Sequence, residues 1–316
     1  MAKIALELER ALARRAELGA PGGLSDRPVA QGEGWSVRDV VCTAGPRDRP
    51  FEERHSAVYI AVVAVGTFQY RSLSAHELMT PGSLLLGNAG QDFTCGHAHA
   101  SGDRCLSFGY TPDYFERIVA DAGVRGTDAT FRVLRVPPVR ALTPVVTQAL
   151  TALARSLVGP DSEMLWEELA LQLAVQTLRL AAGRSSDSTP MPSAVLARVT
   201  RAVRRIEQHP EMPLTLTSLA RDSKLSSYHF LRIFKRLTGV TPHQYILRTR
   251  LREAALRLSS TPTKILDVAL DCGFGDVSNF NRTFRSEFGC GPRAYRRNHP
   301  AGATEAVPVA LTNQSV

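Results

Sequence analysis

Cysteine is scarce in this sequence, and its few copies are scattered. Five cysteines, an odd number, occur at positions 42, 95, 105, 272 and 290 of the 316-residue chain. A secreted disulfide scaffold would carry a denser and even set, so this distribution favours a reducing compartment. Glu7, Glu9 and Arg10 also interrupt the first residues, where a secretory signal would need an apolar stretch. The sequence therefore predicts a cytoplasmic protein.

Long apolar runs and the common catalytic motifs are absent as well. The longest apolar run, Ala57 to Phe68, is too short to cross a membrane, which takes about 20 residues in a helix. The sequence has no Gly-rich phosphate loop, no nucleophile elbow and no recognisable pair of catalytic carboxylates. We therefore expect neither a membrane partner nor an enzyme.

The last third of the chain contains an internal repeat. Ala220 and Leu225 correspond to Ala269 and Phe274 forty-nine positions later. Beyond the turn the offset is fifty, and the matched pairs are Phe230 with Phe280, Arg232 with Arg282, Phe234 with Phe284, Lys235 with Arg285, Gly239 with Gly289, Pro242 with Pro292 and Tyr245 with Tyr295. Such a repeat indicates a duplicated supersecondary unit. Each copy has the pattern of a short helix, a tight turn and a second helix, so the sequence predicts two helix-turn-helix units.

The apolar residues of the second helix in each copy define its outward face. Thr215 and Ser226 or Ser227 are the predicted caps in the first copy. In the second copy, Pro262 is predicted in the first turn of the first helix, Gly273–Phe274 in the turn, and Asp276 as the cap of the second helix. Phe residues recur at helical spacing and must face the core. The outward residues are Ser227, Tyr228, Leu231, Arg232 and Lys235 in the first copy, and Val277, Ser278, Asn281, Arg282 and Arg285 in the second.

These outward faces have the chemistry of base recognition in the major groove. Asn and Arg pair bidentately with adenine and guanine edges, whereas Leu231 and Val277 offer only apolar contact. The alternative is that the polar residues simply solvate two ordinary helices. The duplication favours DNA, and the predicted base-reading residues are Ser227, Tyr228, Leu231, Arg232, Val277, Ser278, Asn281 and Arg282.

A long helix is predicted between the two copies, from Thr241–Pro242 to about Leu258. A rod of about 25 Å would hold the two second helices toward successive major-groove segments, roughly one DNA turn apart. Arginines on this rod are available to phosphates, although solvation is the alternative role. The predicted phosphate contacts are Lys235, Arg236, Arg248 and Arg285.

The charge distribution points to the same region. Between Arg198 and Asn298 there are nineteen Lys or Arg and eight Asp or Glu, whereas the whole chain has a net charge of +8. The remaining residues are therefore net acidic. A basic surplus confined to one domain is what phosphate neutralisation requires.

The stretch from Val199 to Asn298 resembles the DNA-binding domain of the AraC/XylS family of bacterial transcription regulators. The motif residues that carry the resemblance are Ala269, Gly273, Phe274, Phe280, Arg282, Phe284, Gly289, Pro292 and Tyr295. The resemblance implies a seven-helix domain with two helix-turn-helix units. It also implies base contacts from Tyr228, Leu231 and Arg232 in the first unit and from Val277, Ser278, Asn281 and Arg282 in the second.

The preceding residues predict a β-rich domain and hence an α+β multidomain protein. Strands are expected at 35–43, 56–70, 82–87, 93–98 and 104–110, with turn residues between them. This spacing is typical of a jelly-roll or cupin-like barrel, and residues 81–88 resemble the effector domain of many AraC/XylS members. The predicted boundaries are 1–182 for this domain, 183–193 for a linker, 194–298 for the DNA-binding domain and 299–316 for a flexible tail.

Helices flank the predicted barrel. Residues 1–19 are amphipathic, and helices are expected at 141–157 and 163–182. The last of these has Leu165, Leu169, Leu173 and Gln176 or Leu180 at helical spacing with Trp166 nearby, an apolar face that would pack on the barrel or on a second subunit. A homodimer is thus one expectation, and internal packing is the alternative.

A cluster of Cys and His residues is the candidate metal or redox site. Cys95, His97 and His99 project to one face if the strand continues, and Cys105 follows six residues on. A thiolate and two imidazoles are ligands for zinc or another first-row metal. Cys95 and Cys105 are alternatively a redox pair, or the cluster is a polar edge of the barrel.

Together these patterns predict a sequence-specific DNA-binding transcription regulator of the AraC/XylS type. It would respond to a small-molecule, metal or redox signal through its N-terminal domain, with double-stranded DNA and RNA polymerase as partners. The alternative is a cupin-type metal-dependent enzyme with a DNA-binding appendage. That alternative needs a full ligand set and a general acid or base, which the sequence does not display.

Overall fold

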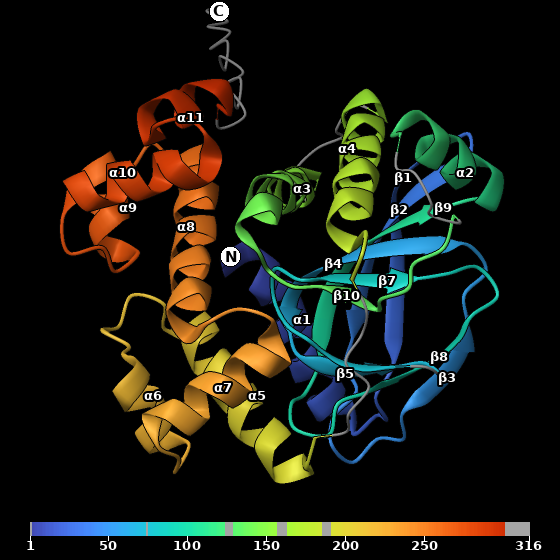
Figure 1. The fold of residues 1–316 in the computed structure, drawn as a ribbon, viewed down its shortest axis with the longest axis horizontal. Helices are drawn as coiled ribbons and strands as arrows, with labels where there is room; N and C mark the ends of the chain where they lie inside the picture. Colours follow the sequence, from blue (N-terminus) through green and yellow to red (C-terminus); the bar gives the residue numbers. More distant parts are fainter. Residues whose placement is uncertain (1, 74, 124–128, 157–162, 185–190, 301–316) are drawn as a thin grey trace, which may run out of the picture.

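The protein consists of a β-rich N-terminal part and a helical C-terminal part, as predicted for an α+β protein (Figure 1). The computed structural model describes residues 2–73, 75–123, 129–156, 163–184 and 191–300. None of the helices in these ranges is long and apolar enough to span a membrane.

Two antiparallel sheets face each other in the N-terminal part, which confirms the predicted β-rich domain. The larger sheet has the strand order β1-β2-β9-β4-β7-β10, and the smaller has the order β3-β8-β5-β6. The strands are β1 (Leu24–Gly32), β2 (Trp35–Cys42), β3 (Phe51–Arg54), β4 (Val58–Gly66), β5 (Phe68–Arg71), β6 (His76–Met79), β7 (Leu84–Gly87), β8 (Asp92–Gly96), β9 (Asp103–Tyr110) and β10 (Arg135–Val136).

The strand predicted at 56–70 is in fact two strands in different sheets. β4 ends at Gly66, whose φ is +86°, and β5 begins at Phe68 on the other side of the sandwich. A Cβ at Gly66 would lie 2.6 Å from the Cα of Asp103, so glycine is needed for this close crossing. The first strand, β1, was not predicted because it is largely exposed and lacks an apolar alternation.

Four helices cover the N-terminal sandwich: α1 (Ala2–Leu18), α2 (Pro112–Asp121), α3 (Thr143–Ser156) and α4 (Glu163–Ala181). The apolar face of α4 packs against the rest of this chain, since Trp166, Leu169 and Leu173 are buried in the main core. The Tyr110 hydroxyl of β9 also donates to the Ala170 carbonyl oxygen at 2.8 Å. Of the two predicted uses of this face, packing on the barrel is the one that occurs within this chain.

Seven helices form the described C-terminal part, as the resemblance implied. They are α5 (Ser193–Gln208), α6 (Leu216–Asp222), α7 (Ser227–Thr238), α8 (Pro242–Ser260), α9 (Ile265–Asp271), α10 (Val277–Phe288) and α11 (Pro292–Asn298). One core gathers α5, α6, α7 and the start of α8, and a second gathers the rest of α8 with α9, α10 and α11. Figure 1 shows α8 as a rod with one helix-turn-helix unit at each end.

The proposed domain boundaries fall between well-formed elements. α4 ends at Ala181, α5 begins at Ser193 and α11 ends at Asn298. Most of the predicted linker and tail, residues 185–190 and 301–316, lies outside the described residues. The boundaries at 182, 194 and 298 therefore stay predictions.

One face of α8 meets the N-terminal domain. The Tyr245 hydroxyl donates to the Pro81 carbonyl oxygen at 3.3 Å, and Arg248 donates to the Pro138 carbonyl oxygen at 3.1 Å. Further along, Leu256 packs into the main core of the β-domain. Arg252 lies beside Gly82, where an added Cβ would come within 2.6 Å of its Nη1. These four residues recur three or four positions apart and so lie on one side of the helix. We call this face the docking stripe, and it comprises Tyr245, Arg248, Arg252 and Leu256.

Two glycines provide a matched test of this docking. Gly239 and Gly289 end α7 and α10 with similar left-handed backbones, at φ of +78° and +76°. A Cβ at Gly239 would overlap the ring of Pro137 in the N-terminal domain, whereas nothing lies within 4 Å of one at Gly289. Both Ala variants should lose about 1 to 2 kcal/mol to backbone strain, and Gly239→Ala should lose more. Equal losses in thermal unfolding would contradict the docked arrangement.

Candidate nucleic-acid interface

The first helix-turn-helix unit is built from capped helices and a tight turn. Thr215 caps α6 in a capping box with Ser218, and the Ser226 hydroxyl accepts from the His229 amide at 3.3 Å to cap α7. The turn between the helices places Lys224 at a positive φ of 53°. Both predicted caps are confirmed, with Ser226 rather than Ser227 as the second.

The outward face of α7 carries the residues predicted from its apolar stripe. Phe230, Phe234 and Leu237 are buried in the core of this unit. Tyr228 is 75% exposed. The rest of this face is exposed at Arg232 and Lys235 and half-buried at Ser227 and Leu231. The polar edge of α7 is thus available to a duplex.

The second unit repeats this construction. The Asp276 carboxylate accepts from the Asn279 amide at 2.7 Å to cap α10. Gly273 holds the turn at φ +83°, at the position that corresponds to Lys224. Pro262 lies before the first helix rather than in its first turn, because α9 begins at Ile265 after Lys264. The prediction for Pro262 was therefore wrong, while those for Gly273 and Asp276 are confirmed.

The outward face of α10 carries exposed polar side chains. Ser278, Asn281, Arg282 and Arg285 are exposed, and Val277 is half-buried. Arg282 donates from Nη2 to the Asn279 Oδ1 at 3.1 Å, so its guanidinium is oriented before any DNA arrives. Asn279 was missed in the sequence, although its place three residues before Arg282 is a recognisable signal.

The arginines of α8 are the clearest correction to the sequence-based interpretation. Arg248 was predicted to contact phosphate, but its side chain is only 11% exposed and reaches Glu287 of α10 and Pro138. Arg250 donates to the carbonyl oxygens of Pro210, Met212 and Gly273. Arg252 pairs with Glu207, and Arg257 pairs with Glu253 and Asp271. These four side chains are engaged by partners within the protein, and so they hold its elements together.

Arg236 also occupies a different place from the other predicted phosphate ligands. It lies beside β6, where it lines a small hollow together with His76, Glu77 and Leu78. Arg236 is exposed, as are Lys235 and Arg285, but only the latter two lie on the outward faces of their helices. The phosphate contacts that the geometry favours are therefore Lys235 and Arg285.

The structure separates the predicted Cys/His cluster. β8 ends at Gly96, so the alternation does not continue to His99, whose Nε2 lies 3.2 Å from the Ser193 hydroxyl at the start of α5. His97 is buried instead, with Nε2 2.6 Å from the Asp103 carboxylate. Cys95 and Cys105 are both buried between the sheets. The convergence of His97 with His99 was a wrong prediction.

The buried thiols are poor candidates for oxidation. Burial, followed by the negative charge of Asp103, raises the pKa of Cys42 to about 12. The same two causes raise the pKa values of Cys95 and Cys105 well above the ordinary range. Since oxidation proceeds through the thiolate, these pKa values argue against Cys95 and Cys105 as a redox pair.

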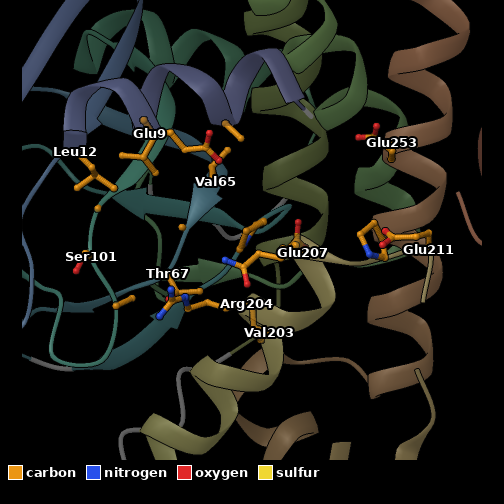
Figure 2. Close-up of a pocket in the computed structure, with 18 of the residues that line it drawn as sticks. Glu9, Leu12, Val65, Thr67, Ser101, Val203, Arg204, Glu207, Glu211 and Glu253 are labelled. Atoms are coloured by element: carbon orange, nitrogen blue, oxygen red, sulfur yellow. The ribbon is translucent and has the colours of Figure 1, made fainter. Parts of the chain in front are cut away.

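A cleft of about 450 Å³ lies between the N-terminal and C-terminal parts (Figure 2). One wall comes from α1, the β4–β5 crossing and residues 100–102, and the other comes from α5 and α8. Its lining contains more acidic than basic side chains: Glu9, Glu207, Glu211, Glu253 and Asp271 against Arg204 and Arg257. Both parts of the protein therefore shape one cavity.

Comparison with known proteins matches the helical part. A family model described as a helix-turn-helix domain matches residues 219–298. The regulatory protein SoxS of Salmonella typhimurium is 36% identical over 91 residues, which are 29% of this chain and 85% of that protein. The right origin-binding protein of Escherichia coli K12 is 37% identical over 93 residues, 29% of this chain and 32% of that protein.

A solved structure also matches the C-terminal part. It is a transcriptional regulator from Chromobacterium violaceum with an AraC-type DNA-binding domain, 30% identical over 35% of this chain and 99% of that chain, with a TM-score of 0.32. Among other curated relatives, the chain spans 37%, 32% and 38% of the length of three further regulators.

The duplicated unit and its exposed polar helices define a double helix-turn-helix protein of the DNA-binding class. With the match to most of SoxS, the chain belongs to the AraC/XylS family of transcription regulators.

The turn of the second unit can be tested with adjacent glycines. A Cβ at Gly273 would lie 2.7 Å from the Glu211 carbonyl oxygen, and φ there is +83°, whereas nothing lies within 4 Å of a Cβ at Gly275. Gly273→Ala should cost about 1 to 3 kcal/mol of unfolding free energy, and Gly275→Ala should be nearly neutral. Denaturant unfolding measures both. A neutral Gly273→Ala would contradict the turn described.

Proposed function

We propose that the protein is a sequence-specific transcription regulator that places α7 and α10 in successive major-groove segments of one duplex. The observation that supports this most directly is the pair of exposed polar helix faces at the two ends of α8. α8 has 19 residues and so is about 28 Å long, close to one DNA turn. A single chain then supplies the two readers that other helix-turn-helix proteins obtain by dimerisation.

The residues divide into base readers and phosphate ligands by their chemistry. Arg232, Asn281 and Arg282 offer the planar donors and acceptors that recognise base edges. Tyr228, Ser227 and Ser278 add hydrogen-bonding groups, and Leu231 and Val277 add apolar contact. Lys235 and Arg285 lie farther along the same faces and would neutralise phosphates.

We propose further that the cleft binds a small-molecule effector. A ligand there would touch α1 and residues 100–102 on one side and α5 and α8 on the other, so its binding would depend on how the two parts are placed. Glu207, Glu253 and Asp271 are paired with Arg252 and Arg257, so the exposed carboxylates of Glu9 and Glu211 are what favours a ligand with positive charge. Such a ligand would couple the N-terminal domain to the DNA-binding domain.

We propose the following cellular location and partners for the protein. The protein would act in the cytoplasm, without catalysis, and RNA polymerase would be its partner at the promoter. A homodimer through α4 would rest on Met164 and Leu171, which are 77% and 38% exposed on this helix. Its other large apolar residues are used within the chain.

Arg282 and Arg285 form a matched pair on α10 that separates base reading from phosphate binding. Arg282→Ala should cost about 1 to 3 kcal/mol on the cognate duplex and less on a random one. Arg285→Ala should weaken both duplexes alike and reduce the salt slope by about one. Fluorescence anisotropy over a salt series measures both. Identical behaviour of the two variants on the two duplexes would contradict the assignment.

The effector proposal makes a separate prediction about ligand charge. Putrescine and agmatine should raise the melting temperature by several degrees at about 100 times their Kd, whereas succinate and glutarate should not. Glu9→Gln removes an exposed carboxylate of the lining and should reduce the shift. Differential scanning fluorimetry gives the answer. Equal shifts from the dicarboxylates would count against a cation-binding cleft.

A further inference from the structure

A cluster of metal-ligand side chains lies between the two sheets, away from the DNA-reading helices. Donor atoms of Cys42, His97 and Asp103 all lie within 4.8 Å of one another, and all three residues are buried. The Cys105 thiol lies beside them, with Sγ 3.3 Å from the Asp103 Oδ2. The set differs from the predicted one because it gains Cys42 and Asp103 and loses Cys95 and His99, while Cys105 only adjoins it.

Strand pairing explains why these residues meet. Cys42 ends β2 and pairs directly with Asp103 at the start of β9, so the two side chains share a face of the larger sheet. Cys105 is two residues farther along β9 and projects to the same face. His97 arrives from the opposite sheet, just after β8 ends at Gly96. Both sides of the sandwich therefore supply donors to the cluster.

The chemistry of this set suits a divalent first-row cation. Thiolate sulfur, imidazole nitrogen and carboxylate oxygen are the ligands that zinc takes in proteins. One thiolate, one carboxylate and a neutral imidazole balance a charge of +2, so the unit is neutral inside an apolar core.

The histidine itself is incompletely satisfied by the protein. Its Nε2 meets Asp103, but its buried Nδ1 has no hydrogen-bond partner among the described residues. Buried side-chain nitrogens are normally hydrogen-bonded when their role is purely structural. His97 therefore differs from His55, whose buried ring bonds to the Tyr70 hydroxyl at 2.6 Å and stacks on Phe93.

We propose that Cys42, His97 and Asp103 bind one divalent first-row cation of the zinc type, with Cys105 next to the remaining coordination position. The segment from His97 to Asp103 is then anchored at both ends by the cation. Its middle, residues 100–102, lines the cleft, and His99 reaches Ser193 at the start of α5. The cation would fix the wall where the two parts of the protein meet. This proposal does not depend on DNA binding.

Metal analysis tests the site. The full-length protein is purified without chelators and reloaded with Zn²⁺ or Co²⁺. We expect about one equivalent of tightly bound metal. The Co²⁺ form should show a thiolate-to-cobalt charge-transfer band and the visible bands of a tetrahedral ion. Cys42→Ser should lose the charge-transfer band, and His97→Ala and Asp103→Asn should weaken binding on the order of 100-fold.

Two variants serve as matched controls. Cys272→Ser changes another buried free cysteine, in the core of the second helix-turn-helix unit, and His99→Ala changes the excluded histidine. Both should keep the metal and the spectrum. The proposal is overturned if wild-type protein takes up neither ion, or if the control variants lose metal as readily as the ligand variants. Metal uptake by the wild type and by the two control variants decides whether the site exists. The test therefore gives a result even if a ligand variant fails to fold.

Discussion

The docking stripe of α8 is the contact on which the rest of the structure depends. Tyr245 and Arg248 reach carbonyl oxygens of the N-terminal domain, and Leu256 enters its main core. The other faces of the same helix belong to the cores of both helix-turn-helix units. One rigid element therefore sets the spacing of the two DNA-binding helices and their position relative to the N-terminal domain.

Arg248 links the second reader to the N-terminal domain. It contacts Glu287 near the end of α10 and the Pro138 carbonyl oxygen, while Thr143 donates to the same Glu287 at 2.6 Å. Burial lowers the pKa of Arg248 from its ordinary value, and the charge of Glu287 opposes this effect. A half-buried charge of this kind needs its partners, so loosening the interface would disturb α10 directly. The Arg248–Glu287 ion pair therefore links α10 to the contact with the N-terminal domain.

Local patterns in the sequence predicted the DNA-binding units well. The predictions that were wrong concern residues whose contacts come from distant parts of the sequence. Phe230, Phe280 and the caps follow from helical spacing, which a sequence displays directly. The role of Arg248 depends on Pro138, more than a hundred residues earlier, and no local pattern reveals that contact. The prediction that His99 joins the Cys/His site was wrong for a related reason. The residue at which β8 ends is set by its pairing with other strands and not by its own sequence.

The central claim is that one chain reads two successive major-groove segments through α7 and α10. Hydroxyl-radical footprinting on a selected site tests it most directly. We expect a monomer to protect two segments on one face of the duplex, about 10 base pairs apart. The double variant Tyr228→Ala and Arg232→Ala should erase one segment, and Asn281→Ala with Arg282→Ala should erase the other. A single protected segment, or loss of both segments from either double variant alone, would contradict the account.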